Sequence, residues 1–217
     1  MKDLRIIIAD DHDIVREGLR QLVEAQPGWT VCAEATTGRE AVEQARHHRP
    51  HVAVLDFSMP ELNGLEATRQ IRKALPQTEV LILTMHDSEE LAREILGAGA
   101  RGFVLKTHAK RQVPLAIAAL AEHKPYFDSS VSALLLESFL NPASPPRESK
   151  TVRDLTPRER EIVQLIAEGR TSKEVAARLG ISAKTVEAHR ANIMNKLNLR
   201  SASQLVLYAV RNKIVQA

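Results

Sequence analysis

Five polar side chains stand at the ends of short apolar stretches in this sequence: Asp10, Asp11, Asp56, Thr84 and Lys106. Carboxylates that lie close together repel one another unless a cation joins them, and ligand sets made only of oxygen favour Mg²⁺. A lysine ammonium group and a threonine hydroxyl group would hold further phosphoryl oxygens. A carboxylate in these surroundings is a nucleophile for phosphoryl transfer, and the product is an acyl phosphate. Each residue alone is more often structural, so the prediction depends on their meeting in space.

The apolar stretches have the composition of strands that are buried on both faces. They cover residues 4–9, 30–35, 52–55, 79–83 and 102–105. Helical patterns that end at proline or glycine alternate with them. This alternation predicts an α/β domain over residues 1–123, with a doubly wound, five-stranded parallel sheet. The carboxyl ends of parallel strands lie at one edge of such a sheet, which would bring the five polar side chains together.

The overall composition is that of an ordinary globular protein. The chain has 217 residues, of which 44% are hydrophobic and 26% charged, and this length suits two domains. Its apolar stretches are far shorter than the roughly 20 residues of a membrane span, and its N-terminus lacks the apolar core of a signal peptide. With one cysteine, Cys32, the chain can form neither an internal disulfide nor a cysteine-based metal cluster. We therefore expect a cytoplasmic protein with no membrane partner.

The charge of the chain divides unevenly along its length. Residues 150–217 contain 13 Lys and Arg against 6 Asp and Glu, a net charge of +7, whereas residues 1–149 contain 17 against 21, a net charge of −4. Residues 124–153 are rich in Pro, Ser and charge, which is typical of a linker, and a helical pattern occurs at 129–140. The basic excess favours a nucleic-acid partner for a second domain at 154–217, although small basic domains of other kinds are common.

The second domain has the pattern of a small helical unit. Residues 156–159 read Thr-Pro-Arg-Glu, which is the capping pattern of a helix start. Two further helices are predicted over 172–179 and 183–197, and a glycine-containing turn joins them. Two short helices joined in this way within a basic domain indicate a helix-turn-helix unit that binds double-stranded DNA.

Helix 183–197 has two distinct faces when its residues are placed at 100° intervals. Val186, Ile193 and Leu197 cluster on the side that must pack against the domain. The opposite face and its flanks carry the candidate DNA-contacting residues: Lys184, Thr185, Glu187, Ala188, Arg190, Ala191, Asn192, Asn195 and Lys196.

The chemistry of these side chains suggests a division of tasks. Glu187 would accept a hydrogen bond from the cytosine amino group, and Lys184 would reach guanine or a phosphate. Arg190 and Lys196 lie nearer the rim of the face and suit phosphates. A solvated helix face is the alternative, and the helix-turn-helix pattern decides against it.

Residues 4–122 resemble the receiver domain of two-component response regulators. The resemblance rests on the acidic pair after the first strand, the stretch VAVLDFSMP with Gly64 downstream, LILT, and GAGARGFVLK. It implies a flavodoxin-like fold and phosphorylation of Asp56 by a histidine kinase. Asp10, Asp11, Asp56 and the backbone carbonyl of Ser58 would then form the Mg²⁺ site.

The same resemblance assigns expectations to the residues around the acceptor. Thr84, Phe103 and Lys106 would stabilise the phosphoryl group or switch with it, and Phe103 matches the aromatic that swings inward on activation. Ser58 and His86 fall where relatives modulate phosphoryl lifetime, and an ordinary loop histidine is the alternative for His86. Many relatives have proline at the position of Thr107, so the geometry after Lys106 is left open.

The segment LTPRERE…NLRS closely resembles the LuxR-type DNA-binding domain, and together the two matches are similar to the NarL/FixJ class of response regulators. This implies a transcriptional regulator that binds promoters through helix 183–197 under the control of phosphorylation. Its expected partners are a histidine kinase, double-stranded DNA, a second copy of the chain on DNA, and RNA polymerase. In that class the helix that begins near Ser201 makes the dimer contact. The candidate residues, which could equally be core, are Leu205, Val206, Tyr208 and Ala209.

Two other functions have to be compared with that of a phosphorylation-controlled regulator. Phosphatases of the haloacid-dehalogenase type also use an aspartyl nucleophile with Mg²⁺, but they usually carry a second Asp two residues later, where this chain has Ser58. We therefore expect a stoichiometric switch and not an enzyme. A receiver-like domain that binds DNA regardless of phosphate is the other alternative, and the complete set of acidic residues argues against it.

Overall fold

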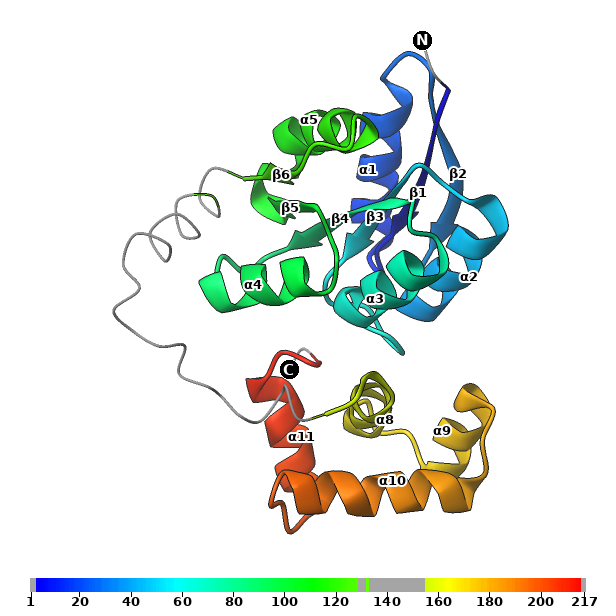
Figure 1. Ribbon diagram of the computed structural model, residues 1–217, viewed down its shortest axis with the longest axis vertical. Helices are drawn as coiled ribbons and strands as arrows, with labels where there is room; N and C mark the ends of the chain where they lie inside the picture. Colours follow the sequence, from blue (N-terminus) through cyan, green and yellow to red (C-terminus); the bar gives the residue numbers. More distant parts are fainter. Residues whose placement is uncertain (1–2, 129–131, 133–154, 216–217) are drawn as a thin grey trace. The chain divides into compact units, whose positions relative to one another are not determined.

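The computed structural model describes residues 3–128, 132 and 155–215 (Figure 1). The chain divides into two compact units, residues 1–143 and 144–217. Among the described residues, every helix is too short or too polar to cross a membrane.

The first unit is built on one parallel sheet of six strands, in the order β2-β1-β3-β4-β5-β6. The strands are β1 (Leu4–Ala9), β2 (Trp29–Ala35), β3 (Val52–Asp56), β4 (Glu79–Thr84), β5 (Gly102–Leu105) and β6 (Tyr126–Phe127). The order of the first five is that of a flavodoxin-like doubly wound fold, in which ligands bind at the carboxyl edge. The predicted fold class is confirmed, apart from the number of strands.

The sixth strand corrects the prediction of five. Tyr126 and Phe127 lie within the predicted linker, yet they pair with Gly102 and Phe103 of β5. Next to them the buried Asp128 carboxylate lies 2.6 Å from Nδ1 of His108. Two residues are too few to show an alternating pattern in the sequence, and they form a strand only because the edge of β5 is open to them.

Five helices cover the two faces of the sheet. Their bounds are α1 (Asp13–Glu24), α2 (Gly38–His48), α3 (Gly64–Ala74), α4 (Glu89–Gly97) and α5 (Ala109–Ala121). Helices α1 and α5 lie on one face of the sheet, and α2, α3 and α4 lie on the other (Figure 1). Apolar side chains of each group pack with the strands on its own face. A three-layer arrangement results, as crossovers between parallel strands require.

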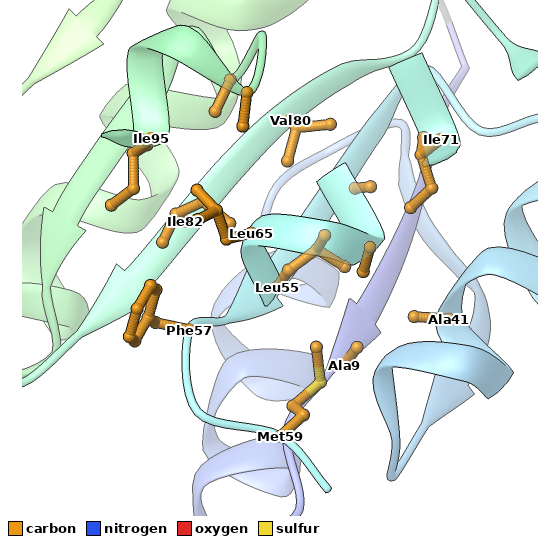
Figure 2. Packing of buried hydrophobic residues seen from close by; sticks show 14 of the residues in the cluster. Ala9, Ala41, Leu55, Phe57, Met59, Leu65, Ile71, Val80, Ile82 and Ile95 are labelled. Atoms are coloured by element: carbon orange, nitrogen blue, oxygen red, sulfur yellow. The ribbon is translucent and has the colours of Figure 1, made fainter. Parts of the chain in front are cut away.

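Figure 2 shows the core beneath α2, α3 and α4. Leu55 and Ile82 of the central strands are 0% exposed and lie among side chains of the covering helices, such as Ile71 of α3 and Ile95 of α4. Each such burial contributes about 1.5–3 kcal/mol to folding. The strands are thereby fixed, and the polar residues at their ends have defined positions.

In the second unit, described over residues 155–215, the helices are α8 (Pro157–Ala167), α9 (Ser172–Leu179), α10 (Ala183–Lys196) and α11 (Ala202–Arg211). The predicted capping box is present at α8, because Thr156 and Glu159 exchange side-chain to backbone hydrogen bonds. Gly180, with φ of 64°, ends α9 in the left-handed conformation that glycine favours and leads into α10. The helix predicted at 129–140 lies outside the described residues, except for Ser132.

Candidate functional site

The predicted acidic residues meet at the carboxyl edge of the sheet. Asp10 follows β1 and Asp56 ends β3, which are neighbouring strands. Oxygens of Asp10, Asp11 and Asp56 and a ring nitrogen of His12 all lie within 4.8 Å of one another. The Asp10 and Asp56 residues are buried, whereas Asp11 and His12 are exposed. The structure therefore brings together side chains that are 46 residues apart in the sequence.

Lys106 reaches the same pocket from the end of β5. Its ammonium nitrogen lies 2.7 Å from Oδ2 of Asp10 and 2.9 Å from Oδ2 of Asp56. Residues 106–108 form a short 3-10 helix that leads directly into α5, which settles the geometry that the sequence left open after Lys106. The lysine thus bridges the two buried carboxylates, as a point charge for phosphoryl oxygens would require.

Burial controls the electrostatics of the pocket. Burial raises the pKa of the Asp56 carboxyl, and the nearby charge of Asp10 adds to this, although Lys106 acts in the opposite direction. Burial by itself would lower the pKa of the Lys106 ammonium, but its hydrogen bonds and charge interactions with the two carboxylates outweigh this and raise the pKa. When all three carboxyl groups are ionised, the single positive charge of Lys106 leaves an excess of negative charge in the pocket.

A divalent cation would balance this excess of negative charge, so we compared the residues present with the ligands that Mg²⁺ prefers. Three carboxylates with converging oxygens, two of them buried, form the hard donor set that Mg²⁺ prefers. The backbone N–H of Ser58 also hydrogen-bonds the Asp56 carboxylate, which places the next turn of the chain beside the pocket. The residues present therefore fit Mg²⁺.

His12 belongs to this pocket, and the sequence reasoning did not include it. Its ring Nδ1 lies 2.9 Å from Oδ1 of Asp11, and its backbone N–H donates to Oδ1 of Asp10. The only signal was its position directly after the acidic pair. A residue that follows a strand end by three positions can turn in many directions, so its sequence position alone was not informative.

The remaining predicted residues lie on β4, on β5 and in the loops that follow β3 and β4. Thr84, at the end of β4, is 1% exposed, and its hydroxyl accepts a hydrogen bond from the backbone N–H of His86 at 3.1 Å. Phe103 is also 1% exposed and belongs to the core beneath α2, α3 and α4, so its ring is inward. His86 itself is exposed, and Ser58 is partly exposed.

Gly64 allows α3 to begin directly beside Asp56. Its backbone N–H donates to the carbonyl of Phe57 at 2.8 Å. A Cβ atom at this position would lie 2.2 Å from the carbonyl oxygen of Asp56, which no side chain could accommodate without a shift. The requirement for glycine therefore comes from a close approach between two segments of backbone.

In the second unit, α10 has the two faces that the sequence predicted. Val186 and Ile193 are 0% exposed and lie in the core. Arg190 is partly exposed. The candidate DNA-contacting residues that are exposed are Lys184, Thr185, Glu187, Ala188, Ala191, Asn192, Asn195 and Lys196.

Lys196 forms an ion pair with a carboxylate from another helix of the domain. Its ammonium group donates to both carboxylate oxygens of Glu159 in α8, each at 2.8 Å. The sequence predicted a phosphate contact for this residue from its place on the helix circumference. That placement could not show a partner 37 residues away.

The apolar stripe on α11 lies largely inside the domain. Leu205 and Ala209 are 0% exposed and Tyr208 is 8% exposed, and all three belong to the core of the second unit. Val206 is partly exposed. Of the two readings of this stripe, burial supports core, and the predicted dimer contact is corrected for the three buried side chains. Leu207, which was not predicted, is 54% exposed.

Comparison with protein families gives two matches along the chain. Residues 6–118 match the response regulator receiver domain, and residues 153–209 match the bacterial regulatory proteins of the luxR family. The oxygen regulatory protein NreC of Staphylococcus epidermidis is 40% identical over 217 residues, covering 98% of this chain and 100% of that protein. NreC of Staphylococcus aureus is 38% identical, with the same coverage.

The similar solved structures are also those of response regulators. RcsB of Salmonella typhimurium is 29% identical, has a TM-score of 0.60, and covers 97% of this chain and 100% of its own. A LuxR-family response regulator from Aurantimonas sp. SI85-9A1 is 35% identical with a TM-score of 0.62, covering 64% of this chain and 99% of its own. RcsB has also been solved in complex with DNA, at 30% identity and a TM-score of 0.58 over 95% of this chain and 98% of its own. With both domains matched over nearly its whole length, this chain belongs to the two-component response regulators that join a receiver domain to a LuxR-type DNA-binding domain.

Proposed function

We propose that Asp56 is the phosphoacceptor through which a histidine kinase controls this transcriptional regulator. A carboxylate oxygen of Asp56 attacks the phosphorus of a phosphohistidine, the P–N bond breaks, and the imidazole nitrogen keeps the electron pair and takes up a proton. The product is an acyl phosphate on Asp56. The observation that carries the proposal is the convergence of Lys106 and three carboxylates at the end of β3.

The surrounding residues have separate tasks in this reaction. Asp10, Asp11, Asp56 and the Ser58 carbonyl would hold Mg²⁺, which when bound offsets the negative charge of phosphoryl oxygens. Lys106 would pair with one phosphoryl oxygen. We assign Thr84, whose hydroxyl lies at the end of the adjacent strand, as a hydrogen-bond donor to another. The ring of Phe103 already lies inward, which is the position that the resemblance gives to the activated state.

Intact-mass measurement after treatment with Mg²⁺ and acetyl phosphate tests the acceptor. We expect one added phosphoryl group on the wild-type chain that hydroxylamine removes, and none on Asp56→Asn. Asp87→Asn is the matched control, because Asp87 is an exposed acid in the loop after Thr84 and should leave labelling unchanged. Full labelling of the Asp56→Asn chain would rule out the assignment.

The second part of the proposal is that α10 reads promoter DNA. The exposed face of α10 contains small residues, Ala188 and Ala191, which permit close approach to base edges, and Lys184 and Glu187, which can hydrogen-bond to them. The RcsB–DNA complex supports this proposal through the likeness of the whole chain.

Binding to operators selected from random DNA tests this part. Substitution of Lys184 or Glu187 by Ala should change the selected sequence, whereas Arg190→Ala should weaken binding to all sequences alike and lower the salt slope by about 1. Unchanged preference in the first two variants would refute the readout assignment.

We further propose that the chain binds DNA as a homodimer and that the partly exposed Val206 and the exposed Leu207 of α11 provide the contact. An RcsB structure that contains two RcsB dimers bound to two DNAs supports dimerisation by analogy. Analytical ultracentrifugation on a two-half-site DNA should give two chains per duplex, and Leu207→Asp should give one. Two chains per duplex in that variant would exclude α11 as the contact.

A further inference from the structure

Lys196, the last residue of α10, is bound to a buried carboxylate of its own domain. Its ammonium group donates to both Oε1 and Oε2 of Glu159, each at 2.8 Å. The Glu159 residue is 5% exposed, so the pair is shielded from water on the acid's side. Hydrogen bonds between charged groups are stronger than those between neutral groups, and shielding strengthens them further.

Glu159 also holds the start of α8. Its Oε2 accepts a hydrogen bond from the backbone N–H of Thr156 at 2.8 Å, and the Thr156 hydroxyl accepts from the backbone N–H of Glu159 at 3.2 Å. Burial would raise the pKa of this carboxyl, but the hydrogen bonds from Lys196 and Thr156 outweigh burial and lower it. The carboxylate is therefore ionised at neutral pH, and it ties the first turn of α8 to the last turn of α10.

The rest of α10 contacts the domain mainly on one side. Val186 and Ile193 are its fully buried side chains, and they lie seven residues apart, about 20° from each other around the helix. Ala183, Met194 and Leu197 also pack against the core but are only partly buried, and all three lie on the same side of Ile193. A contact that extends to one side of the buried line opposes rotation about the helix axis less than a contact on both sides.

Lys196 is placed where it can oppose that rotation. It lies about 60° around the helix from the Ile193 side chain, whereas Lys184 on the outer face lies about 180° away. An ion pair at the edge of the contact line, at the end of the helix, fixes both the rotation and the tilt. The side chains on the outer face then point in a defined direction.

From this geometry we infer that Lys196 is a positioning residue for DNA readout, which orients α10 through Glu159 and does not contact the DNA backbone. The inference rests on the proposed function of α10 as the DNA-reading helix. It replaces the phosphate contact that the sequence predicted for Lys196.

Arg190 supplies a matched control on the same helix. It lies about 60° from Ile193 on the other side of the contact line, so a helical wheel treats the two basic residues as equivalent. Arg190 is partly exposed and makes no ion pair within the described part of the chain. If only their place on the wheel mattered, Arg190→Met and Lys196→Met would have the same effect on DNA binding.

The experiment uses the full chain treated with Mg²⁺ and acetyl phosphate, with an operator that the wild type selects from random DNA and a scrambled duplex as probes. Affinity for both duplexes is measured as a function of salt for wild type, Arg190→Met, Lys196→Met and Glu159→Gln. Arg190→Met should lower the salt slope by about 1 and keep the ratio of specific to non-specific affinity. Lys196→Met should keep the slope and lower that ratio by at least about tenfold, because misdirected side chains lose base contacts.

The Glu159→Gln variant distinguishes a positioning role of Lys196 from a phosphate contact of Lys196, even if the Lys196→Met chain does not fold. Glutamine at this position preserves the capping box, so the variant keeps the start of α8 and loses the negative charge that pairs with Lys196. A positioning role predicts that its specificity falls as in Lys196→Met, and that the double variant loses no more than either single variant. A phosphate contact predicts the opposite direction, since Glu159→Gln would weaken the hold of the domain on Lys196 and let it bind DNA more tightly.

The possible outcomes test the positioning role of Lys196 separately from the proposed DNA-reading function of α10. A salt slope that falls by about 1 in Lys196→Met with unchanged specificity, or tighter binding by Glu159→Gln, would overturn the positioning role and leave the DNA-reading function standing. Equal wild-type affinity for selected and scrambled duplexes would overturn that function, and with it the inference. Far-UV circular dichroism at the assay temperature confirms which variants are folded.

Discussion

Replacement of Gly64 by alanine is expected to damage the acceptor pocket without touching any of its reactive groups. The new Cβ would lie 2.2 Å from the carbonyl oxygen of Asp56, and real contacts of this kind are at least 3.0 Å, so α3 must move away by about 0.8 Å. The hydrogen bond from the Gly64 N–H to the Phe57 carbonyl, now 2.8 Å, would stretch beyond normal length. Loss of that bond costs about 1 kcal/mol, and overpacking adds about 1–3 kcal/mol.

The assay measures stability and phosphorylation in the same variant. Urea unfolding followed by the fluorescence of Trp29, the single tryptophan, reports the receiver unit. A displacement of about 0.8 Å between α3 and the Asp56 backbone should also slow phosphorylation by acetyl phosphate, by about tenfold to a hundredfold. Gly18→Ala is the control, because a Cβ at Gly18, within α1, would meet nothing within 4 Å and should stabilise the helix by about 0.5–1 kcal/mol.

Two results would contradict this prediction. If the Gly64→Ala chain is as stable as the Gly18→Ala chain and accepts phosphate at the wild-type rate, the close approach of α3 to Asp56 does not constrain position 64. A loss of stability with normal phosphorylation would show that α3 yields without moving the acceptor strand, which would remove Gly64 from the list of residues that shape the site.

Three further predictions concern buried charges. Asp56→Asn removes one of two carboxylates buried side by side and leaves the other paired with lysine. In metal-free buffer the free energy of unfolding of this variant in urea should therefore be higher by about 1 kcal/mol, and a lower value would contradict the prediction. Hydrogen bonds, chiefly from Lys196, lower the pKa of Glu159 against the effect of burial, so its stabilising contribution is complete above its ordinary pKa of 4.5 and is lost as pH falls through the lowered value. The urea midpoint of wild type should therefore exceed that of Glu159→Gln at about pH 6 and approach it at about pH 3, and a constant difference would exclude this linkage. A double-mutant cycle of His108→Ala and Asp128→Ala should give a coupling energy of about 1 kcal/mol for their 2.6 Å contact, and additive effects would show that the contact does not hold β6 in place.

The features that the sequence predicted correctly are those whose signal is local. Apolar runs with turn formers at their ends located five strands, and the alternation with helical patterns implied a parallel sheet with its functional edge at Asp10, Asp56 and Lys106. The capping box of Thr156 and Glu159 was visible because both partners lie within one helical turn. The periodicity of apolar residues, two in strands and 3.6 in helices, can be read directly from the sequence, and so can a helix cap whose partners lie within four residues. Neither requires knowledge of distant neighbours.

Features that depend on distant neighbours were decided by the tertiary structure. Arg190 and Lys196 are equivalent on a helical wheel, yet only the second is bound to Glu159, because the packing of α8 against α10 brings that carboxylate to one side of the helix. The α11 stripe could be core or interface until burial placed Leu205 in the core. The two-residue strand β6 exists because β5 leaves an open edge. Composition and periodicity determine which surface of an element is apolar, but the partner that meets each surface is chosen by packing among segments far apart in the chain.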